Sequence, residues 1–245
     1  MDRSAARYLE ALTAEVAAVV GDRLVGVYAH GSLLVGGYLP SRSDVDVVVV
    51  VEDALSAGEQ ADVAARLQEE CLPCPAVGLE LSVVTRASAA APTARPAFEL
   101  HMTTAPEDRK VVDGHGHPGE LDLVLHYAVL HRVDPDVFAE VPRPLVLRQL
   151  ADELTWAAEH NPSEYAVLNA CRAWRYAVDG SLVSKVDGGR WAEARLSGAD
   201  LTLVRAALAH QQGDPSTDLD AEAVRSFVTR TRDVLGRGRP GDRDG

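Results

Sequence analysis

The sequence predicts an α+β protein in which an N-terminal mixed sheet with helices is followed by an all-α helical bundle. In the first hundred residues, strand-like and helix-like apolar patterns alternate, whereas every periodic stretch after about residue 118 has helical spacing. The length of 245 residues suits two modest domains. We therefore predict a sheet domain at 1–110, a helical bundle domain at 111–236 and a disordered, polar, glycine-rich tail at 237–245.

The predicted elements of the first domain follow from apolar spacing. A helix is predicted over 6–20, because Leu9, Leu12 and Val16 recur on one helical face. The run of valines at 47–51 is continuous, which is typical of a strand that is buried on both faces. A proline- and alanine-rich segment at 87–97 is a plausible hinge. The other predicted elements are strands at 24–28, 44–51 and 79–85 and a helix at 56–70.

The second domain contains only helical patterns. Glycine and proline residues separate them, as expected at helix ends. No stretch in this part is predicted to be a strand. The predicted helices span 119–132, 143–160, 163–179, 187–196, 199–212 and 219–235.

The charge and the cysteine content narrow the function classes. The net charge is −13, with 37 acidic and 24 basic residues, which disfavours binding to nucleic acid. Residues 99–164 contain 13 acidic and 5 basic residues, a composition that would attract a cationic partner. Three cysteines and no apolar run of membrane-spanning length lead us to expect a soluble cytoplasmic protein with no disulfide framework and no membrane contact.

The segment with the clearest chemistry runs from Gly31 to Asp46. A Gly31-Ser32 pair follows a predicted strand, and Asp44 and Asp46 open the next one. Strand residues two apart point to the same side, so the two carboxylates repel each other unless a divalent cation lies between them. Oxygen ligands in partial number suit Mg²⁺, which also accepts water and substrate phosphates. A third carboxylate, Glu80, lies on the following predicted strand.

Two further pairs, one of cysteines and one of histidines, are weaker indications of chemistry. Cys71 and Cys74 have the spacing of a redox pair, but they follow a predicted helix, whereas the redox motif opens one. His115 and His117 lie in a glycine-rich stretch without a third ligand and are expected to be a solvated turn. An Asp-x-Asp alone is usually a solvated strand edge. The Gly-Ser pair upstream and Glu80 downstream favour a metal site instead.

At these residues the sequence resembles the nucleotidyltransferase superfamily, whose pattern is a Gly-Ser pair followed about a dozen residues later by Asp-x-Asp. It is more closely similar to the aminoglycoside adenylyltransferases that act on streptomycin and spectinomycin. The resemblance extends over nearly the whole chain. It is carried by stretches at 95–100, 120–125 and 137–142 and by the segment 167–196, with its L-x-x-x-R-x-W and W-A-x-x-R-L motifs.

The resemblance implies an N-terminal nucleotidyltransferase-type sheet, a helical bundle and an active site between them. It implies transfer of AMP from ATP to a hydroxyl group of a cationic aminocyclitol or aminoglycoside such as spectinomycin, with release of pyrophosphate. Eight residues receive roles: Asp44 and Asp46 as Mg²⁺ ligands, Glu80 as general base, and Gly31, Ser32, Ser43, Arg172 and Lys185 as nucleotide contacts. Lys185 is one of only two lysines in the chain.

The sequence departs from the streptomycin-using members at two positions. Their tryptophan follows the pair that matches Glu99-Leu100, and its position falls near Ala105 here. Their acidic residue precedes the pair that matches Val167-Leu168, and its nearest counterpart here falls on 161–163. The acceptor is therefore left open among spectinomycin, a related aminocyclitol and a substrate outside resistance. The chain is expected to act as a monomer. The alternative functions are adenylylation of a protein or of another small molecule, and a regulatory role as a nucleotide-binding partner.

Overall fold

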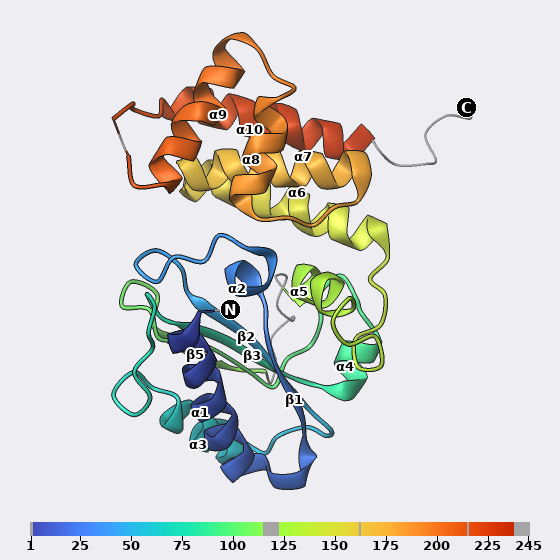
Figure 1. Ribbon diagram of the computed structural model, residues 1–245. Coiled ribbons are helices and arrows are strands. Elements are labelled where there is room, and N and C mark those ends of the chain that lie inside the picture. Colours follow the sequence, from blue (N-terminus) through green and yellow to red (C-terminus); the bar gives the residue numbers. More distant parts are fainter. Residues whose placement is uncertain (1, 115–122, 162, 215, 238–245) are drawn as a thin grey trace, which may run out of the picture. The chain divides into compact units, whose positions relative to one another are not determined.

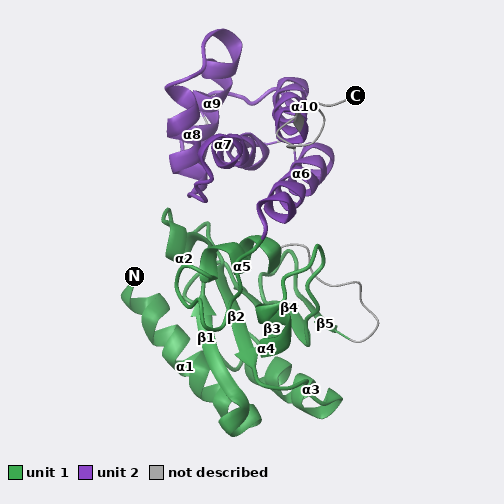
Figure 2. Cartoon of the chain, turned by 90° about the vertical axis from the view of Figure 1, so that its right-hand side faces the viewer, with its two compact units in different colours: residues 1–141 green, residues 142–245 purple. Residues whose placement is uncertain are grey.

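The computed structural model describes residues 2–114, 123–161, 163–214 and 216–237. The chain forms two compact units, residues 1–141 and 142–245, which Figure 2 shows in different colours. The first unit contains a five-stranded sheet, and the described elements of the second are all helices. The predicted α+β fold is thus confirmed. The predicted tail lies outside the described residues from residue 238 onward.

The sheet of the first unit has the strand order β1-β2-β3-β4-β5. Only β2 and β3 are parallel, and the other neighbours are antiparallel, so the sheet is mixed. The connection between the parallel strands contains helix α3, Ala57–Arg66. The strands are β1 Leu24–Ala29, β2 Val45–Val51, β3 Leu79–Thr85, β4 Leu100–Thr103 and β5 Lys110–Asp113.

The strands β4 and β5 were not predicted from the sequence. Each has only four residues, too few for a clear alternation of apolar and polar side chains. They pair with each other, and β5 begins at the predicted domain boundary between residues 110 and 111. The sheet therefore keeps this segment in the first unit, and the compact unit extends to Val141.

The two faces of the sheet differ in chemistry. One face carries alternate apolar residues of β2 and β3, such as Val47, Val49 and Leu81, which form one cluster with α1 (Arg3–Val20) and α3 (Figure 1). Because side chains alternate along a strand, the other face carries the polar residues of the same strands. These are Asp46, Glu80 and Ser82, and their β4 partners His101 and Thr103 lie on the same face. This second face is also partly covered, since Val48, Val50 and Val84 are fully buried.

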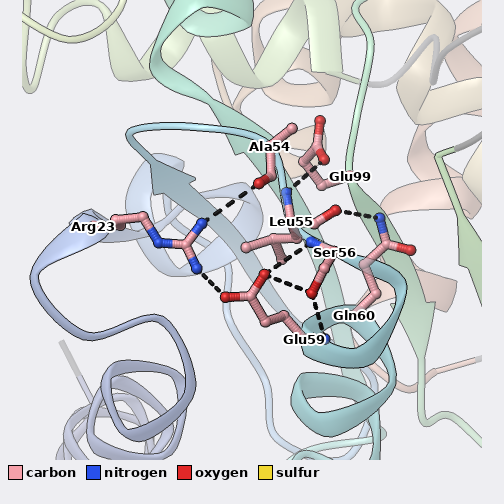
Figure 3. A network of polar contacts seen from close by, with 7 residues as sticks. All are labelled: Arg23, Ala54, Leu55, Ser56, Glu59, Gln60 and Glu99. Atoms are coloured by element: carbon pink, nitrogen blue, oxygen red, sulfur yellow. Dashed lines mark hydrogen bonds and ion pairs between the residues drawn. The ribbon is translucent and has the colours of Figure 1, made fainter.

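A polar network fixes the loop between β2 and α3 (Figure 3). Ser56 caps α3 and forms a reciprocal capping box with Glu59, which also pairs with Arg23. The Glu99 carboxylate accepts a hydrogen bond of 2.9 Å from the Leu55 backbone N–H. Glu99 directly precedes β4, so this bond ties the entry of β4 to the loop that follows β2.

The second unit consists of five long helices in its described residues, and capping residues mark their ends. Ser163 and Ser184 cap the N-termini of α7 and α8, and Gly180 ends α7 in the left-handed conformation with a φ of +74°. The helices are α6 Arg143–His160, α7 Glu164–Asp179, α8 Lys185–Glu193, α9 Gly198–Gln211 and α10 Ala221–Arg237. All five were predicted from the sequence, with ends that differ by a few residues.

Three further α-helices lie in the described residues of the first unit: α2 Gly31–Val35, α4 Arg86–Ala90 and α5 Leu123–Leu130. The sequence predicted a turn where α2 lies and a hinge near α4. Helix α5 lies inside the predicted helix 119–132, whose first residues are outside the described part. In the residues that the structure describes, no helix combines the length and the apolar character needed to cross a membrane.

Candidate active site

Two predicted site residues lie side by side on the polar face of the sheet. Asp46 on β2 and Glu80 on β3 are register partners in the parallel ladder, and partners in register point to the same face. Asp44 lies directly before β2, two residues from Asp46, and the Val45 N–H that follows it is bonded to the Gly78 carbonyl at 2.8 Å. The sheet therefore brings the start of β2 and the start of β3 together at the predicted site.

Gly31 lies against the Asp46 carboxylate. Its φ is +52°, and a Cβ atom at this position would lie 1.8 Å from Oδ2 of Asp46. A side chain is thus excluded by both the backbone conformation and the contact. The preceding residue, His30, donates its backbone N–H to the Asp46 carbonyl at 3.0 Å. Backbone pairing and close packing together hold the Gly31 turn at the carboxylate.

The two predicted serine contacts have different surroundings. The Ser32 hydroxyl oxygen is buried and has no hydrogen-bond partner within the described part of the chain. The Ser43 hydroxyl instead accepts a 3.1 Å hydrogen bond from the Leu39 N–H, and the Ser43 carbonyl accepts one from the Val77 N–H. Ser43 thus closes the turn that leads into Asp44. The Ser32 hydroxyl therefore remains available to form a hydrogen bond with a ligand.

Two histidine rings lie close together behind the turn. The His30 ring is 2% exposed and lies 3.7 Å from the His126 ring of α5, measured between ring centroids. Burial, with a smaller contribution from His126, lowers the pKa of His30 well below its usual range. His30 therefore stays uncharged at neutral pH. The sequence analysis did not single out His126, because helical spacing alone cannot tell which residue reaches the turn.

The next row of the polar face adds a second buried pair. Ser82 and His101 are register partners of β3 and β4, and Ser82 Oγ lies 3.0 Å from His101 Nδ1. Both side chains are buried. Glu80 itself faces Thr103 on β4. His101 and Thr103 were missed because β4 was not predicted.

The donor set fits a hard cation such as Mg²⁺. The Asp44 and Asp46 carboxylates provide only oxygen ligands, and the absence of a Cβ at Gly31 lets the chain approach Asp46 closely. Within the described residues, no three His, Cys, Asp or Glu side chains form a group that could hold a metal ion. A Mg²⁺ ion bound by the aspartates would therefore take further ligands from water and substrate phosphates, as this ion usually does.

Arg172 and Lys185 lie in the second unit, in contact with one polar cluster. The Arg172 guanidinium pairs with Glu153 of α6 at 2.8 Å, and the Lys185 ammonium lies 4.1 Å from the centre of the Tyr165 ring. Glu153, Tyr165 and Asn169 were not identified from the sequence. Tyr165 and Asn169 could have been found from the sequence, because they recur with Arg172 at the spacing of one helical face.

The weaker motifs carry no site in the described residues. Burial raises the pKa of the Cys74 thiol to about 11, which is the opposite of the shift that activates a redox cysteine. His115 and His117 lie outside the described residues.

Comparisons with known proteins give two findings. Residues 136–233 match the family model described as the aminoglycoside adenylyltransferase C-terminal domain. The chain is also similar in structure to spectinomycin adenyltransferase AAD(9) from Enterococcus faecialis, solved with ATP and spectinomycin. The TM-score is 0.67 at 15% sequence identity, over 94% of this chain and 99% of the other. No curated protein matches the sequence.

Proposed function

We infer that this chain, whose residues 136–233 carry the aminoglycoside adenylyltransferase C-terminal domain and whose fold is that of a spectinomycin adenyltransferase, is a nucleotidyltransferase. It transfers AMP from ATP to a hydroxyl group of a cationic aminocyclitol or aminoglycoside such as spectinomycin and releases pyrophosphate. The observation that carries this proposal is the pairing of Asp46 with Glu80 beside the Gly31 turn.

The proposed reaction divides the carboxylates between two roles. Asp44 and Asp46 hold Mg²⁺, which neutralises charge on the triphosphate when it is bound. Glu80 accepts the proton of the acceptor hydroxyl, whose oxygen forms a bond to the α-phosphorus of ATP. The bond between the α-phosphorus and the bridging oxygen breaks, and the electron pair leaves with pyrophosphate. The register partnership supports this division, because Glu80 lies beside Asp46 on the adjacent strand.

Five residues are proposed as nucleotide contacts. The Gly31 backbone and the Ser32 hydroxyl bind phosphate oxygens, and the buried, unsatisfied Ser32 oxygen supports this role. Ser43 contributes through the turn that it closes before Asp44. Arg172 and Lys185 of the second unit are the cationic candidates for phosphate contacts. In this proposal the enzyme acts as a monomer in the cytoplasm, where ATP and Mg²⁺ are available.

The acceptor is proposed to be cationic because of the charge distribution. The acidic excess of residues 99–164 suits the ammonium groups of an aminocyclitol. The tryptophan of the streptomycin-using members falls near Ala105, whose backbone packs directly against Gly78, two residues before Glu80. Without that aromatic side chain near the base, spectinomycin is favoured over streptomycin.

Pyrophosphate release tests the proposal directly. The purified chain is incubated with ATP and Mg²⁺ alone, with spectinomycin and with streptomycin. The proposal expects release that depends on spectinomycin and disappears when the divalent cation is chelated. Equal release with and without any aminocyclitol would point to another acceptor. No release under any condition would contradict an adenylyltransferase activity on these drugs.

A further inference from the structure

One carboxylate in the second unit organises three side chains of the neighbouring helix. Oε1 of Glu153, on α6, accepts hydrogen bonds from the Tyr165 hydroxyl at 3.2 Å, the Asn169 amide at 3.0 Å and the Arg172 guanidinium at 2.8 Å. The Glu153 side chain is 13% exposed, and Asn169 is buried. A half-buried carboxylate with three donors has little freedom to move, so its partners are fixed with it.

The same carboxylate also reaches Lys185, through Tyr165. The Lys185 ammonium lies over the Tyr165 ring, 4.1 Å from its centre, which is the geometry of a cation–π contact. Because the Tyr165 hydroxyl is held by Glu153, the ring that carries Lys185 has a defined place. Both cations assigned to the phosphates are thereby connected to Glu153, one directly and one through an aromatic ring.

The helix packing reinforces this arrangement. A Cβ atom on Gly188 of α8 would lie 2.8 Å from the backbone nitrogen and Cα of Arg172, so only glycine allows α8 to approach α7 at this point. Ser184 caps α8 through the Asp187 N–H and fixes the helix start at Lys185. The backbones that carry Arg172 and Lys185 are thus held together, and Glu153 then orients their side chains.

We propose that Glu153 is a positioning residue for nucleotide binding, which holds Arg172 directly and Lys185 through Tyr165 in the orientation that receives the triphosphate. The inference rests on the proposed function. Two readings of the cluster predict opposite effects. Positioning predicts that loss of Glu153 weakens ATP binding, because two flexible cations must then be ordered by the ligand. If Glu153 acted only through its charge, its loss would tighten ATP binding, because a negative charge near two cations would be removed.

The test measures the dissociation constant of ATP·Mg²⁺ by calorimetry on the full chain. Glu153→Ala is expected to weaken binding about 10- to 100-fold, the usual cost of misplaced contact groups. Glu153→Gln keeps an acceptor oxygen and is expected to recover most of the affinity. Tyr165→Phe removes one hydroxyl donor and is expected to give a smaller loss. Glu193→Ala breaks an exposed ion pair with Arg205 in the same unit and serves as the control with unchanged affinity.

Kinetics separates positioning from a loss of folded protein. Glu153→Ala is expected to raise the KM for ATP while kcat at saturating ATP and the KM for the acceptor stay within about threefold. A folding defect would instead reduce the amount of active enzyme and lower kcat. If Glu153→Ala does not fold, the measurement is made with Tyr165→Phe, which removes the hydroxyl that Glu153 holds. ATP affinity equal to that of the wild type in this folded variant then overturns the proposal.

Variants of Arg172 and Lys185 distinguish a failure of the positioning role from a failure of the proposed function. If Arg172→Ala and Lys185→Ala bind ATP as the wild type does, their phosphate role is wrong and the positioning role falls with it. If these variants bind ATP weakly but Glu153→Ala binds it normally or more tightly, only the positioning role is wrong. In a variant that already carries Arg172→Ala and Lys185→Ala, adding Glu153→Ala is expected to change the dissociation constant of ATP by less than about twofold, because the three residues act together.

Discussion

Asp46 and Glu80 are partners in the parallel ladder of β2 and β3, so their carboxylates leave the same face of the sheet from adjacent strands. Adjacent strands lie about 5 Å apart, a distance at which two negative charges repel each other unless a cation or a proton lies nearby. A bound cation beside Asp46 would reduce this repulsion. Our account assigns Asp46 to the metal and Glu80 to the proton.

The metal role predicts a loss of activity with the fold intact. Asp46→Asn keeps the size of the side chain but removes a negative ligand, so kcat is expected to fall at least about 100-fold. Mg²⁺ with ATP is expected to raise the unfolding temperature of the wild type but not that of the variant. Asp53→Asn, at an exposed position just after β2, is the control. Near-normal turnover of Asp46→Asn at saturating Mg²⁺ would remove the metal assignment.

The base role predicts a separation of binding from chemistry. Glu80→Gln is expected to bind ATP and spectinomycin as the wild type does, measured by calorimetry, and to lose about 10²- to 10⁴-fold in kcat. The amide keeps the shape of the carboxylate but cannot accept the proton of the hydroxyl. If binding disappeared together with the rate, Glu80 would be a ligand of the metal or the substrate, and the base would be another group.

The close approach at Gly31 predicts a specific steric effect. Gly31→Ala would place a methyl group against the Asp46 carboxylate, so ATP binding and the free energy of unfolding should both fall. Gly36→Ala provides the matched control, since Gly36 also has a positive φ but no atom within 4 Å of its would-be Cβ. The free energy of unfolding of the control is expected to fall by about 1–3 kcal/mol, because a residue other than glycine is strained at a positive φ. The control is expected to bind ATP as the wild type does. Similar ATP affinities in both variants would show that the contact with Asp46 is unimportant.

The Glu99 contact predicts an effect on stability alone. Glu99→Ala leaves the Leu55 N–H without its carboxylate acceptor, which is expected to cost about 1–3 kcal/mol in the free energy of unfolding. Ser56→Ala, which removes the cap of α3 in the same network, is expected to cost about 1 kcal/mol. Urea denaturation measures both. A large fall in the kcat of folded Glu99→Ala would place this residue in the reaction instead.

The sequence was sufficient to predict the elements that position the carboxylates. The valine run of β2 and the alternation in β3 are strong patterns, and the Gly-Ser and Asp-x-Asp spacing could be read without a structure. The register that places Asp46 beside Glu80 could not be read from the sequence, because it depends on which strands pair and in which direction. The sequence analysis placed Glu80 on the next strand but could not identify its neighbour.

Short elements and tertiary clusters were beyond sequence reasoning. The strands β4 and β5 have four residues each, and their pairing with β3 and with each other decides their conformation. Tyr165, Asn169 and Arg172 share one face of α7, but no local pattern links them to Glu153 on α6. Arg172 and Lys185 were identified through the family resemblance, and the residue that connects them was found only in the structure.

The most direct test of the account follows the fate of the α-phosphorus. The chain is incubated with spectinomycin, Mg²⁺ and ATP labelled at the α-phosphorus, and the products are separated by chromatography. The account predicts that the label moves to spectinomycin in the wild type and stays on ATP with Asp46→Asn or Glu80→Gln. Label that remains on the nucleotide in the wild type, while ATP and spectinomycin both bind, would contradict it.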